Sequence, residues 1–285
     1  MRMRNERLHD IDNGEVIIQL ENVTKKFNKK PLLTDINLTI DKGQSIALTG
    51  NNGVGKSTLL KIIANLSSIQ NGKVTYTRKL LFNYIPEHFP RTNLTIVQYL
   101  SLIARIDEIS KKDIQKIINT YLKEFYMEHM SDTPLLYLSK GSLQKVSVIQ
   151  SLLVMPDVLL LDEPLSGLDI KSQRVFIKKM KELKTFGVTI IMSCHEKYLM
   201  NEISDVVVEI QNGQIETTVH KKDEVGTIFI LTFIDEVGGL TLPPLAFPID
   251  ETENKVGVYV DEDRTNEVVS LMISQGWSLR GMHHE

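Results

Sequence analysis

The sequence predicts an α/β fold, and three features carry that prediction. An apolar run at 45–49 is followed by a glycine-rich turn and then by a helical pattern that ends near residue 63. Continuous apolar runs at 158–162 and 188–192 have the composition of strands that are covered on both faces. Between these runs, apolar residues recur as in the crossover helix that joins two parallel strands. The crossover residues are Val175, Ile177, Met180 and Leu183.

Shorter segments predict further strands on either side of this core. Residues 16–20 are expected to form a strand, and residues 36–40 alternate between apolar and polar side chains as a half-buried strand does. Asn71-Gly72 is expected to form a tight turn before another strand. Asn212-Gly213 is expected at the turn of a β-hairpin, because both residue types tolerate the positive φ angles that such turns need.

A helical insert is predicted between about residues 92 and 145. Thr95 and Gln98 have the spacing of a capping box, in which each side chain accepts from the backbone N–H of the other. Ser110 is expected to open a second helix whose apolar side chains share one face. That face consists of Ile114, Ile117, Ile118, Tyr121, Leu122 and Phe125.

The chain divides into three segments. We expect a polar N-terminal tail at 1–15, an α/β domain at 16–220 and a smaller α+β unit at 221–285. Within the C-terminal unit, a pair of apolar segments predicts strands, and a helix that contains Val268 and Met272 is expected to end at Gly276.

The composition excludes several classes of protein. The 285 residues include 33 basic and 36 acidic ones, a net charge of −3 that argues against a nucleic-acid-binding surface. The single cysteine, Cys194, excludes an internal disulfide framework and is compatible with a reducing cytoplasm. No run of about eighteen uninterrupted apolar residues occurs, and the polar start of the chain lacks the apolar core of a signal peptide. The sequence therefore predicts no membrane span.

The turn after the first buried strand has the residues of a phosphate-binding loop. Gly50, Gly53 and Gly55 leave backbone N–H groups free to converge on an anion, and the helix that follows adds its favourable dipole. Lys56 is then expected to reach the β- and γ-phosphates, and Ser57 to offer a hydroxyl to Mg²⁺. The alternative is a glycine-rich turn that only ends a strand. The strand-turn-helix context favours a nucleoside triphosphate site.

Two adjacent carboxylates follow the strand predicted at 158–162. Asp162 and Glu163 lie at the edge where α/β sheets bind ligands. One carboxylate there can hold Mg²⁺, and its neighbour can polarise an attacking water. Acidic residues also end strands simply because they are solvated there. About a hundred residues after a phosphate loop, however, the pair favours a role in Mg²⁺ binding and catalysis.

Three other segments have both a structural and a functional interpretation. Ser139 precedes an apolar helix, where it is either an ordinary N-cap or part of a second anion site. Residues 166–169 follow the acidic pair at 162–163 closely, and their structural interpretation is a strand-to-helix turn. His195 ends the strand at 188–192, where a histidine is usually structural but can also reach a γ-phosphate.

These segments resemble the motifs of the ATP-binding cassette (ABC) ATPases, and they occur in the same order. The motifs are the phosphate loop at 50–58, the Q-loop region around Glu87, the signature at 138–142, Walker B at 158–163, the D-loop at 166–169 and the histidine switch at His195. The resemblance covers residues 16–220 and implies a P-loop NTPase cassette with an antiparallel β subdomain and a helical subdomain. It implies ATP and Mg²⁺ as cofactors, Glu163 as the base that orients water and His195 as the γ-phosphate sensor. The implied nucleotide-binding residues are Phe27, Gly50, Asn51, Asn52, Gly53, Val54, Gly55, Lys56, Ser57, Thr58, Ser139, Gly141 and Asp169.

Phe27 takes the place of the family's adenine-stacking aromatic, with an exposed strand-end aromatic as the alternative. The implied Mg²⁺ ligands are Ser57, Asp162 and Glu87. The sequence departs from the family at two points. The signature reads LSKGS where many members have LSGGQ, although Ser139 and Gly141 are kept. In the Q-loop region, Glu87 stands where the family usually has glutamine. Both side chains offer an oxygen, but only glutamine can also donate.

The resemblance also implies how the ATP is used. Two cassettes close face to face, so that each ATP lies between the phosphate loop of one chain and the signature of the other. The expected partners are a second ABC subunit, in a homodimer or a heterodimer, and a separate integral membrane permease at the cytoplasmic face of the membrane. No nucleic acid is expected. The small C-terminal unit resembles the extensions on cassettes of drug, peptide-antibiotic and lipid exporters, which favours export.

Two alternatives belong to other classes. The first is a soluble ABC ATPase that acts on ribosomes or DNA. The ribosomal members usually carry two cassettes and the DNA members insert long coiled coils, neither of which occurs here. The second is a non-hydrolysing binding module, which the presence of Glu163 and His195 disfavours.

Overall fold

The described residues of the computed structural model form two compact units. The structure describes residues 14–107, 109–220, 228–236, 240, 247–252, 255–261 and 264–284. The first unit contains the described residues up to His195 together with Ile203–His220. The second contains Glu196–Glu202 and the described residues beyond 221. Within the described ranges of the chain, no helix has the length and apolar character that crossing a membrane requires.

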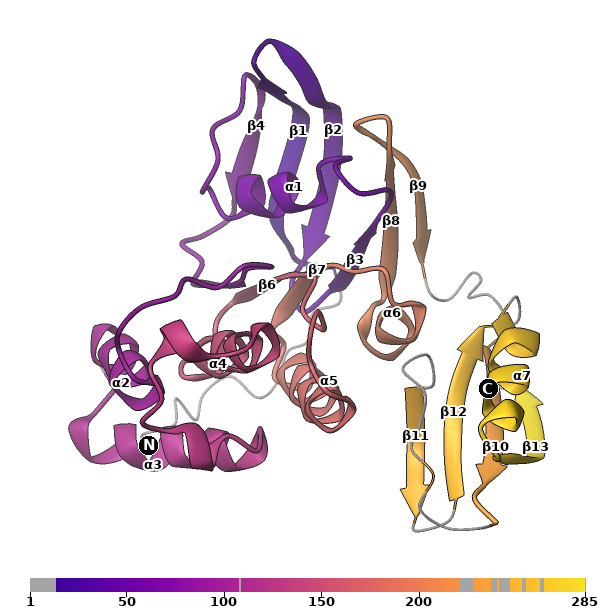
Figure 1. The fold of residues 1–285 in the computed structure, drawn as a ribbon. Helices are drawn as coiled ribbons and strands as arrows, with labels where there is room; N and C mark the ends of the chain where they lie inside the picture. Colours follow the sequence, from indigo (N-terminus) through magenta and orange to yellow (C-terminus); the bar gives the residue numbers. More distant parts are fainter. Residues whose placement is uncertain are drawn as a thin grey trace. The chain divides into compact units, whose positions relative to one another are not determined.

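A six-stranded sheet forms the centre of the first unit (Figure 1). Its order is β5-β6-β7-β3-β8-β9, and every neighbouring pair is parallel except β8 and β9. The predicted buried strands are confirmed, since every residue of β6 and β7 is buried. The strands are β3 (Ser45–Thr49), β5 (Phe82–Ile85), β6 (Val158–Asp162), β7 (Thr189–Ser193), β8 (Val206–Gln211) and β9 (Gln214–His220).

A separate antiparallel sheet has the order β2-β1-β4, with β1 at Val16–Phe27, β2 at Lys30–Asp41 and β4 at Asn71–Tyr76. The strands predicted at 16–20 and 36–40 are thus parts of longer ones. The tight turn predicted at Asn71-Gly72 is wrong, because both residues belong to β4. Gly72 has a φ of 84° and lies so close to β1 that a Cβ would be 2.4 Å from the carbonyl oxygen of Asn22. The glycine serves this close approach, not a turn.

One hydrophobic core joins the two sheets to α1 (Lys56–Ile63). Leu20 and Ile36 contribute from the antiparallel sheet, Leu48 and Val208 from the mixed sheet, and Leu60 from the helix. The hairpin predicted between β8 and β9 is confirmed, with φ of 50° at Asn212 and 78° at Gly213. The segment that joins β3 to α1 is thereby held between rigid elements.

Helices α2 (Ile96–Ile106), α3 (Lys111–Glu124) and α4 (Lys140–Leu152) pack together, as Figure 1 shows. Two short 3₁₀ turns, Glu128–Met130 and Leu135–Tyr137, lie between α3 and α4. The predicted caps are confirmed. Thr95 and Gln98 form the capping box of α2, and Ser110 is the N-cap residue of α3. On α3 the buried residues are Ile114, Ile118 and Leu122, followed by Phe125, whereas Ile117 and Tyr121 are partly exposed.

The crossover helix is α5 (Ile170–Thr185), between β6 and β7. Its buried apolar residues are Phe176 and Met180, while Val175, Ile177 and Leu183 are partly exposed. The helix is therefore as predicted, but Met180 is the one residue of the expected four that is buried. Phe176, which the prediction did not include, is fully buried.

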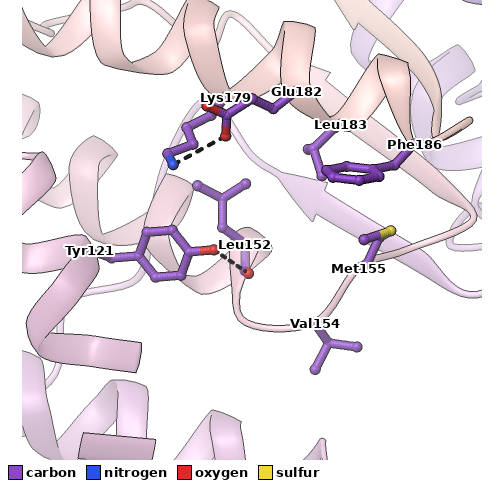
Figure 2. A pocket seen from close by; sticks show the side chains of 8 residues that line it. All are labelled: Tyr121, Leu152, Val154, Met155, Lys179, Glu182, Leu183 and Phe186. Carbon is purple, nitrogen blue, oxygen red and sulfur yellow. Dashed lines mark hydrogen bonds and ion pairs between the residues drawn. The ribbon is translucent and has the colours of Figure 1, made fainter. Parts of the chain in front are cut away.

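A pocket of about 130 Å³ lies on the outer side of this unit, where α3, the end of α4 and α5 meet (Figure 2). Lys179 on α5 forms ion pairs with Glu124 at 3.1 Å and Glu182 at 3.2 Å, and Tyr121 donates to the carbonyl oxygen of Leu152 at 3.1 Å. Burial lowers the pKa of Lys179, but the hydrogen bonds that its ammonium donates to Glu124 and Glu182 outweigh this effect, so the net pKa is raised. The pocket contains none of the predicted site residues.

The second unit is a four-stranded antiparallel sheet of order β11-β12-β10-β13, with helix α7. Leu231, Phe233, Met272 and Trp277 form its core. The helix predicted to end at Gly276 is confirmed, since this glycine follows α7 with a φ of 95°. The elements are α6 (Lys197–Ile203), β10 (Ile228–Ile234), β11 (Phe247–Thr252), β12 (Lys255–Asp261), α7 (Thr265–Ser274) and β13 (Ser278–His284).

Candidate functional site

The predicted phosphate loop connects β3 to α1, and its backbone requires glycine. Gly50, Gly53 and Gly55 have φ values of 129°, 79° and 115°, which residues with a Cβ rarely adopt. A Cβ on Gly50 would lie 2.2 Å from the carbonyl oxygen of Ile210, so the loop also presses against β8. Among the other loop residues, Asn51 and Asn52 are exposed, whereas Val54 and Thr58 are partly buried.

Lys56 begins α1 and is almost fully buried, with 6% of its surface exposed. Its ammonium donates to the carbonyl oxygen of Gly50 at 2.8 Å and lies 3.2 Å from Nε2 of His195. An ammonium held inside the loop by its own backbone is placed to meet an anion that the loop N–H groups bind.

Asp162 is buried at the end of β6, and both of its carboxylate oxygens accept hydrogen bonds. Ser57 donates to Oδ1 at 2.8 Å and Ser193 donates to the same oxygen at 2.7 Å. Tyr84 donates to Oδ2 at 3.0 Å. Burial raises the pKa of the Tyr84 phenol well above its usual value, and the negative charges of Asp162 and Glu87 add to the shift. The phenol is thus held as a donor.

The pair of Ser57 and Asp162 fits a magnesium ion. Two oxygens on neighbouring corners of an octahedron with Mg²⁺–O distances of 2.0–2.1 Å lie about 2.9 Å apart. The observed separation of Ser57 Oγ and Asp162 Oδ1 is 2.8 Å. Across the described residues, no cluster of three or more His, Cys, Asp or Glu side chains could hold a metal by itself. Such a pair is what a metal needs when phosphate and water oxygens supply the other ligands.

Glu163 and His195 face each other beside the loop. Oε1 of Glu163 lies 3.2 Å from Nε2 of His195, and the same nitrogen lies 3.1 Å from Oδ1 of Asn52. The backbone of Glu163 has a φ of 49°, and its N–H donates to the carbonyl oxygen of Ser193 at 3.0 Å. The imidazole therefore stands between the carboxylate, the loop amide and the ammonium of Lys56.

The signature segment forms a second cluster with residues 166–169. Ser139 is the N-cap of α4, and its hydroxyl accepts from the N–H of Ser142 at 3.1 Å. Gly141 approaches Gly167 so closely that a Cβ at position 141 would be 2.0 Å from the carbonyl oxygen of Gly167. Lys140 donates to Ser166 at 2.7 Å.

Asp169 belongs to this second cluster. It is the N-cap of α5, accepts from the N–H of Ser172 at 2.9 Å and forms an ion pair with Lys145 at 2.5 Å. Partial burial raises the pKa of Asp169, but the hydrogen bonds from Lys145 and Ser172 outweigh it, so the net pKa is lowered. The carboxylate is thereby kept ionised in a fixed position.

Two predicted residues, Phe27 and Glu87, form no described contact with the phosphate loop, Asp162, Glu163 or His195. Phe27 at the end of β1 is 54% exposed, with the ammonium of Lys25 5.1 Å from its ring centroid. Glu87 follows β5 with its side chain 45% exposed, and its carboxylate lies 3.9 Å from Nδ1 of His88. The negative charge of Glu87 helps to raise the pKa of Tyr84. The Glu87 carboxylate forms no described contact with Ser57 or Asp162.

Sequence reasoning missed Tyr84 and Ser193. Both lie at the carboxyl ends of strands that flank β6, and Ser193 is the register partner of Asp162. The only signal was their position, since polar residues at neighbouring strand ends converge in a parallel sheet. Tyrosine and serine are too common at strand ends for that signal to single them out.

Comparison with known proteins identifies the family. A family model described as "ABC transporter" matches residues 33–166. An uncharacterized ABC transporter ATP-binding protein of Methanocaldococcus jannaschii is 33% identical over 69% of this chain and 75% of its own length. The zinc import ATP-binding protein of Rickettsia conorii is 32% identical over 70% and 84%.

Solved structures show the same fold. The ATP-binding subunit of an ABC transporter superposes with a TM-score of 0.67 at 27% identity, over 73% of this chain and 91% of its own. A dimeric ATP-binding cassette bound to ADP and Pi in a post-hydrolysis state gives a TM-score of 0.65 at 24% identity, over 72% and 98%.

The fold and the two clusters define a P-loop ATPase with the architecture of an ATP-binding cassette. The chain belongs to the ATP-binding subunits of ABC transporters. It is accordingly an ABC-type ATPase, and subunits of this family dimerise and work with a membrane permease.

Proposed function

We propose that this protein hydrolyses Mg²⁺-ATP as a peripheral subunit at the cytoplasmic face of a membrane, where it drives a separate permease. One observation carries the proposal. Three separate segments of the chain bring polar side chains within hydrogen-bonding distance of one another at the phosphate loop. These side chains are Lys56 and Ser57 from the loop, Asp162 and Glu163 from the end of β6, and His195. We assign the ATPase domain to residues 16–220 and an accessory role to residues 221–285.

The loop and its lysine bind the triphosphate. Backbone N–H groups between Gly50 and Thr58 contact the β- and γ-phosphates, and Lys56 exchanges its hydrogen bond with the Gly50 carbonyl for phosphate oxygens. Ser57 and Asp162 hold Mg²⁺, which when bound neutralises charge on the phosphates. Phe27 stacks on adenine, for which its exposed ring is available.

Glu163 accepts the proton of the attacking water, and His195 contacts the γ-phosphate. The 3.2 Å distance between Glu163 Oε1 and His195 Nε2 places base and imidazole on the same side of the loop. With Nε2 protonated, the imidazole can donate to Glu163, to Asn52 or to a phosphate oxygen. This choice of partners suits a group that reports whether the γ-phosphate is present.

The second cluster acts on the nucleotide of another copy or of a related subunit. Ser139 and the N-terminal end of α4 present a hydroxyl and backbone N–H groups, and Gly141 keeps that end free of side-chain bulk. Asp169 is fixed next to them by Lys145. A dimer in which each cluster faces the partner's phosphate loop would complete two ATP sites.

We propose export as the direction of transport, on the resemblance of the small C-terminal unit to extensions of exporter cassettes. Several relatives are import ATP-binding proteins, which makes import the second candidate. One is the zinc import protein cited above, and another is a spermidine/putrescine import ATP-binding protein of Clostridium novyi, 31% identical over 78% of this chain. Co-purification from detergent-solubilised membranes would identify the permease and decide between them.

The test of the ATPase site is Glu163→Gln, which keeps the shape of the side chain and removes the base. We expect ATP affinity, measured by fluorescence titration, to stay within about threefold of the wild type, while turnover falls about 10²- to 10⁴-fold. The variant should also accumulate an ATP-bound dimer on size-exclusion chromatography.

The matched control is Glu209→Gln, which removes an exposed carboxylate from β8. Its turnover should equal that of the wild type. Phosphate release by Glu163→Gln at a rate close to that of the control would refute the role of Glu163.

A further inference from the structure

The carboxylate of Asp162 is held from both sides by two residues to which no role has been assigned so far, Tyr84 and Ser193. It lies at the end of β6, whose neighbours in the sheet are β5 and β7. Tyr84 on β5 donates to Oδ2 at 3.0 Å, and Ser193 on β7 donates to Oδ1 at 2.7 Å. Each flanking strand thus supplies one donor, and each oxygen receives one of them.

This arrangement fixes the rotation of the carboxylate. The terminal torsion of an aspartate is soft, so one hydrogen bond leaves the group free to turn. Two donors on different oxygens, each carried by a parallel strand of the same sheet, remove that freedom. Oδ1 is thereby kept 2.8 Å from the hydroxyl of Ser57.

Ser193 also contacts the neighbouring Glu163. Its hydroxyl oxygen lies 3.3 Å from the Glu163 nitrogen and accepts from that N–H, while its carbonyl oxygen accepts from the same group at 3.0 Å. Ser193 is fully buried and cannot exchange these partners for water. One side chain therefore connects the two acidic residues of the site.

We propose that Tyr84 and Ser193 are positioning residues that hold the Asp162 carboxylate in the orientation that binds the metal ion of Mg²⁺-ATP. The proposal rests on the function proposed for Asp162. A purely structural role is the competing explanation, since buried polar groups need hydrogen-bond partners in any protein. The two explanations differ in their effect on metal affinity.

The variants are Tyr84→Phe and Ser193→Ala in the full chain, each of which removes one hydroxyl. The probe is Mn²⁺, whose binding in the presence of a non-hydrolysable ATP analogue is measured by electron paramagnetic resonance. We expect the Mn²⁺ dissociation constant to rise on the order of tenfold in each variant, and further in the double variant. Affinity for the analogue in EDTA should not change.

Matched controls remove equivalent hydroxyls elsewhere. Tyr99→Phe removes a half-buried phenol that donates to Gln150 at 2.6 Å, and Ser151→Ala removes a buried hydroxyl that donates to the carbonyl oxygen of Val148 at 2.8 Å. Both controls should bind Mn²⁺ as the wild type does. Thermal unfolding, recorded for all variants, shows the structural cost of each change.

The outcomes separate this proposal from the proposed function. If Tyr84→Phe and Ser193→Ala lower only the melting temperature while Asp162→Asn weakens Mn²⁺ binding, the positioning role is refuted and the metal site stands. If Asp162→Asn also leaves Mn²⁺ affinity unchanged, the metal site fails and the positioning role with it. Should Ser193→Ala not fold, the conservative Tyr84→Phe decides alone.

Discussion

Replacing Gly141 by alanine tests the close contact between the signature segment and residues 166–169. A Cβ at position 141 would lie 2.0 Å from the carbonyl oxygen of Gly167, and real Cβ contacts are at least about 3.0 Å. The two segments must therefore separate by at least about 1 Å. Neither side can yield cheaply, because the atom that is met belongs to the backbone.

Overpacking of this kind costs about 1–3 kcal/mol of stability. Gly141 lies in the first turn of α4, so the preference of a helix interior for alanine over glycine offsets little of this cost. The melting temperature should fall by about 2–12 °C. Activity should fall as well, because a displacement of 1 Å in a catalytic assembly can cost about 10²-fold in rate.

The assay compares steady-state ATPase turnover with thermal unfolding and ATP affinity. Gly187→Ala is the control for adding a Cβ without a clash: Gly187 has a positive φ of 78° in a turn, unlike the helical Gly141, and a Cβ at position 187 would meet no atom within 4 Å. The control should lose about 1–2 kcal/mol of stability from backbone strain and keep its turnover. A Gly141→Ala protein with turnover near the wild type would refute the reasoning, and so would one that loses ATP affinity, because the phosphate loop is unchanged.

Two further predictions concern the dimer and the metal. Ser139→Arg and Lys56→Ala should each be inactive alone but recover ATPase activity when mixed, because one composite site of the mixed dimer is then intact. If cross-linking shows that mixed dimers form but no activity returns, the arrangement in trans is contradicted. Glu87→Gln should raise the Mg²⁺ concentration for half-maximal activity and leave ATP affinity at saturating Mg²⁺ little changed, because it removes a charged oxygen whose field reaches Tyr84, the donor to Asp162. An unaltered Mg²⁺ titration would show that Glu87 is a solvated loop carboxylate.

Local signals explain why most of the fold could be predicted. The capping box at Thr95 and the hairpin turn at Asn212-Gly213 depend on residues that are neighbours in sequence, and both are confirmed. The turn expected at Gly72 is wrong because sequence alone does not show that β1 passes against this glycine. The lengths of β1 and β2 exceed the predicted ones for the same reason, since cross-strand pairing extends both strands beyond their apolar cores.

The candidate site divides in the same way. Lys56 and Ser57 follow from the spacing of the loop glycines, and Asp162 from its place at the end of a buried strand. Tyr84 and Ser193 depend on the strand order β5-β6-β7, which brings segments about a hundred residues apart in sequence to the two sides of one carboxylate. Order in a parallel sheet is set by packing of the crossover helices, and no local pattern encodes it.

Glu163 shows how the sheet can maintain a conformation that its own sequence disfavours. A φ of 49° at a residue with a Cβ costs about 1–2 kcal/mol, and asparagine or aspartate is the usual residue where such an angle is needed. Here the N–H of Glu163 is held by two acceptors of Ser193, a neighbour that is itself fixed by strand pairing. The angle turns the chain sharply after β6 and leaves the Glu163 carboxylate 3.2 Å from His195. Strain at this position is therefore offset by the same residue that orients Asp162, which couples the geometry of the base to that of the metal ligand.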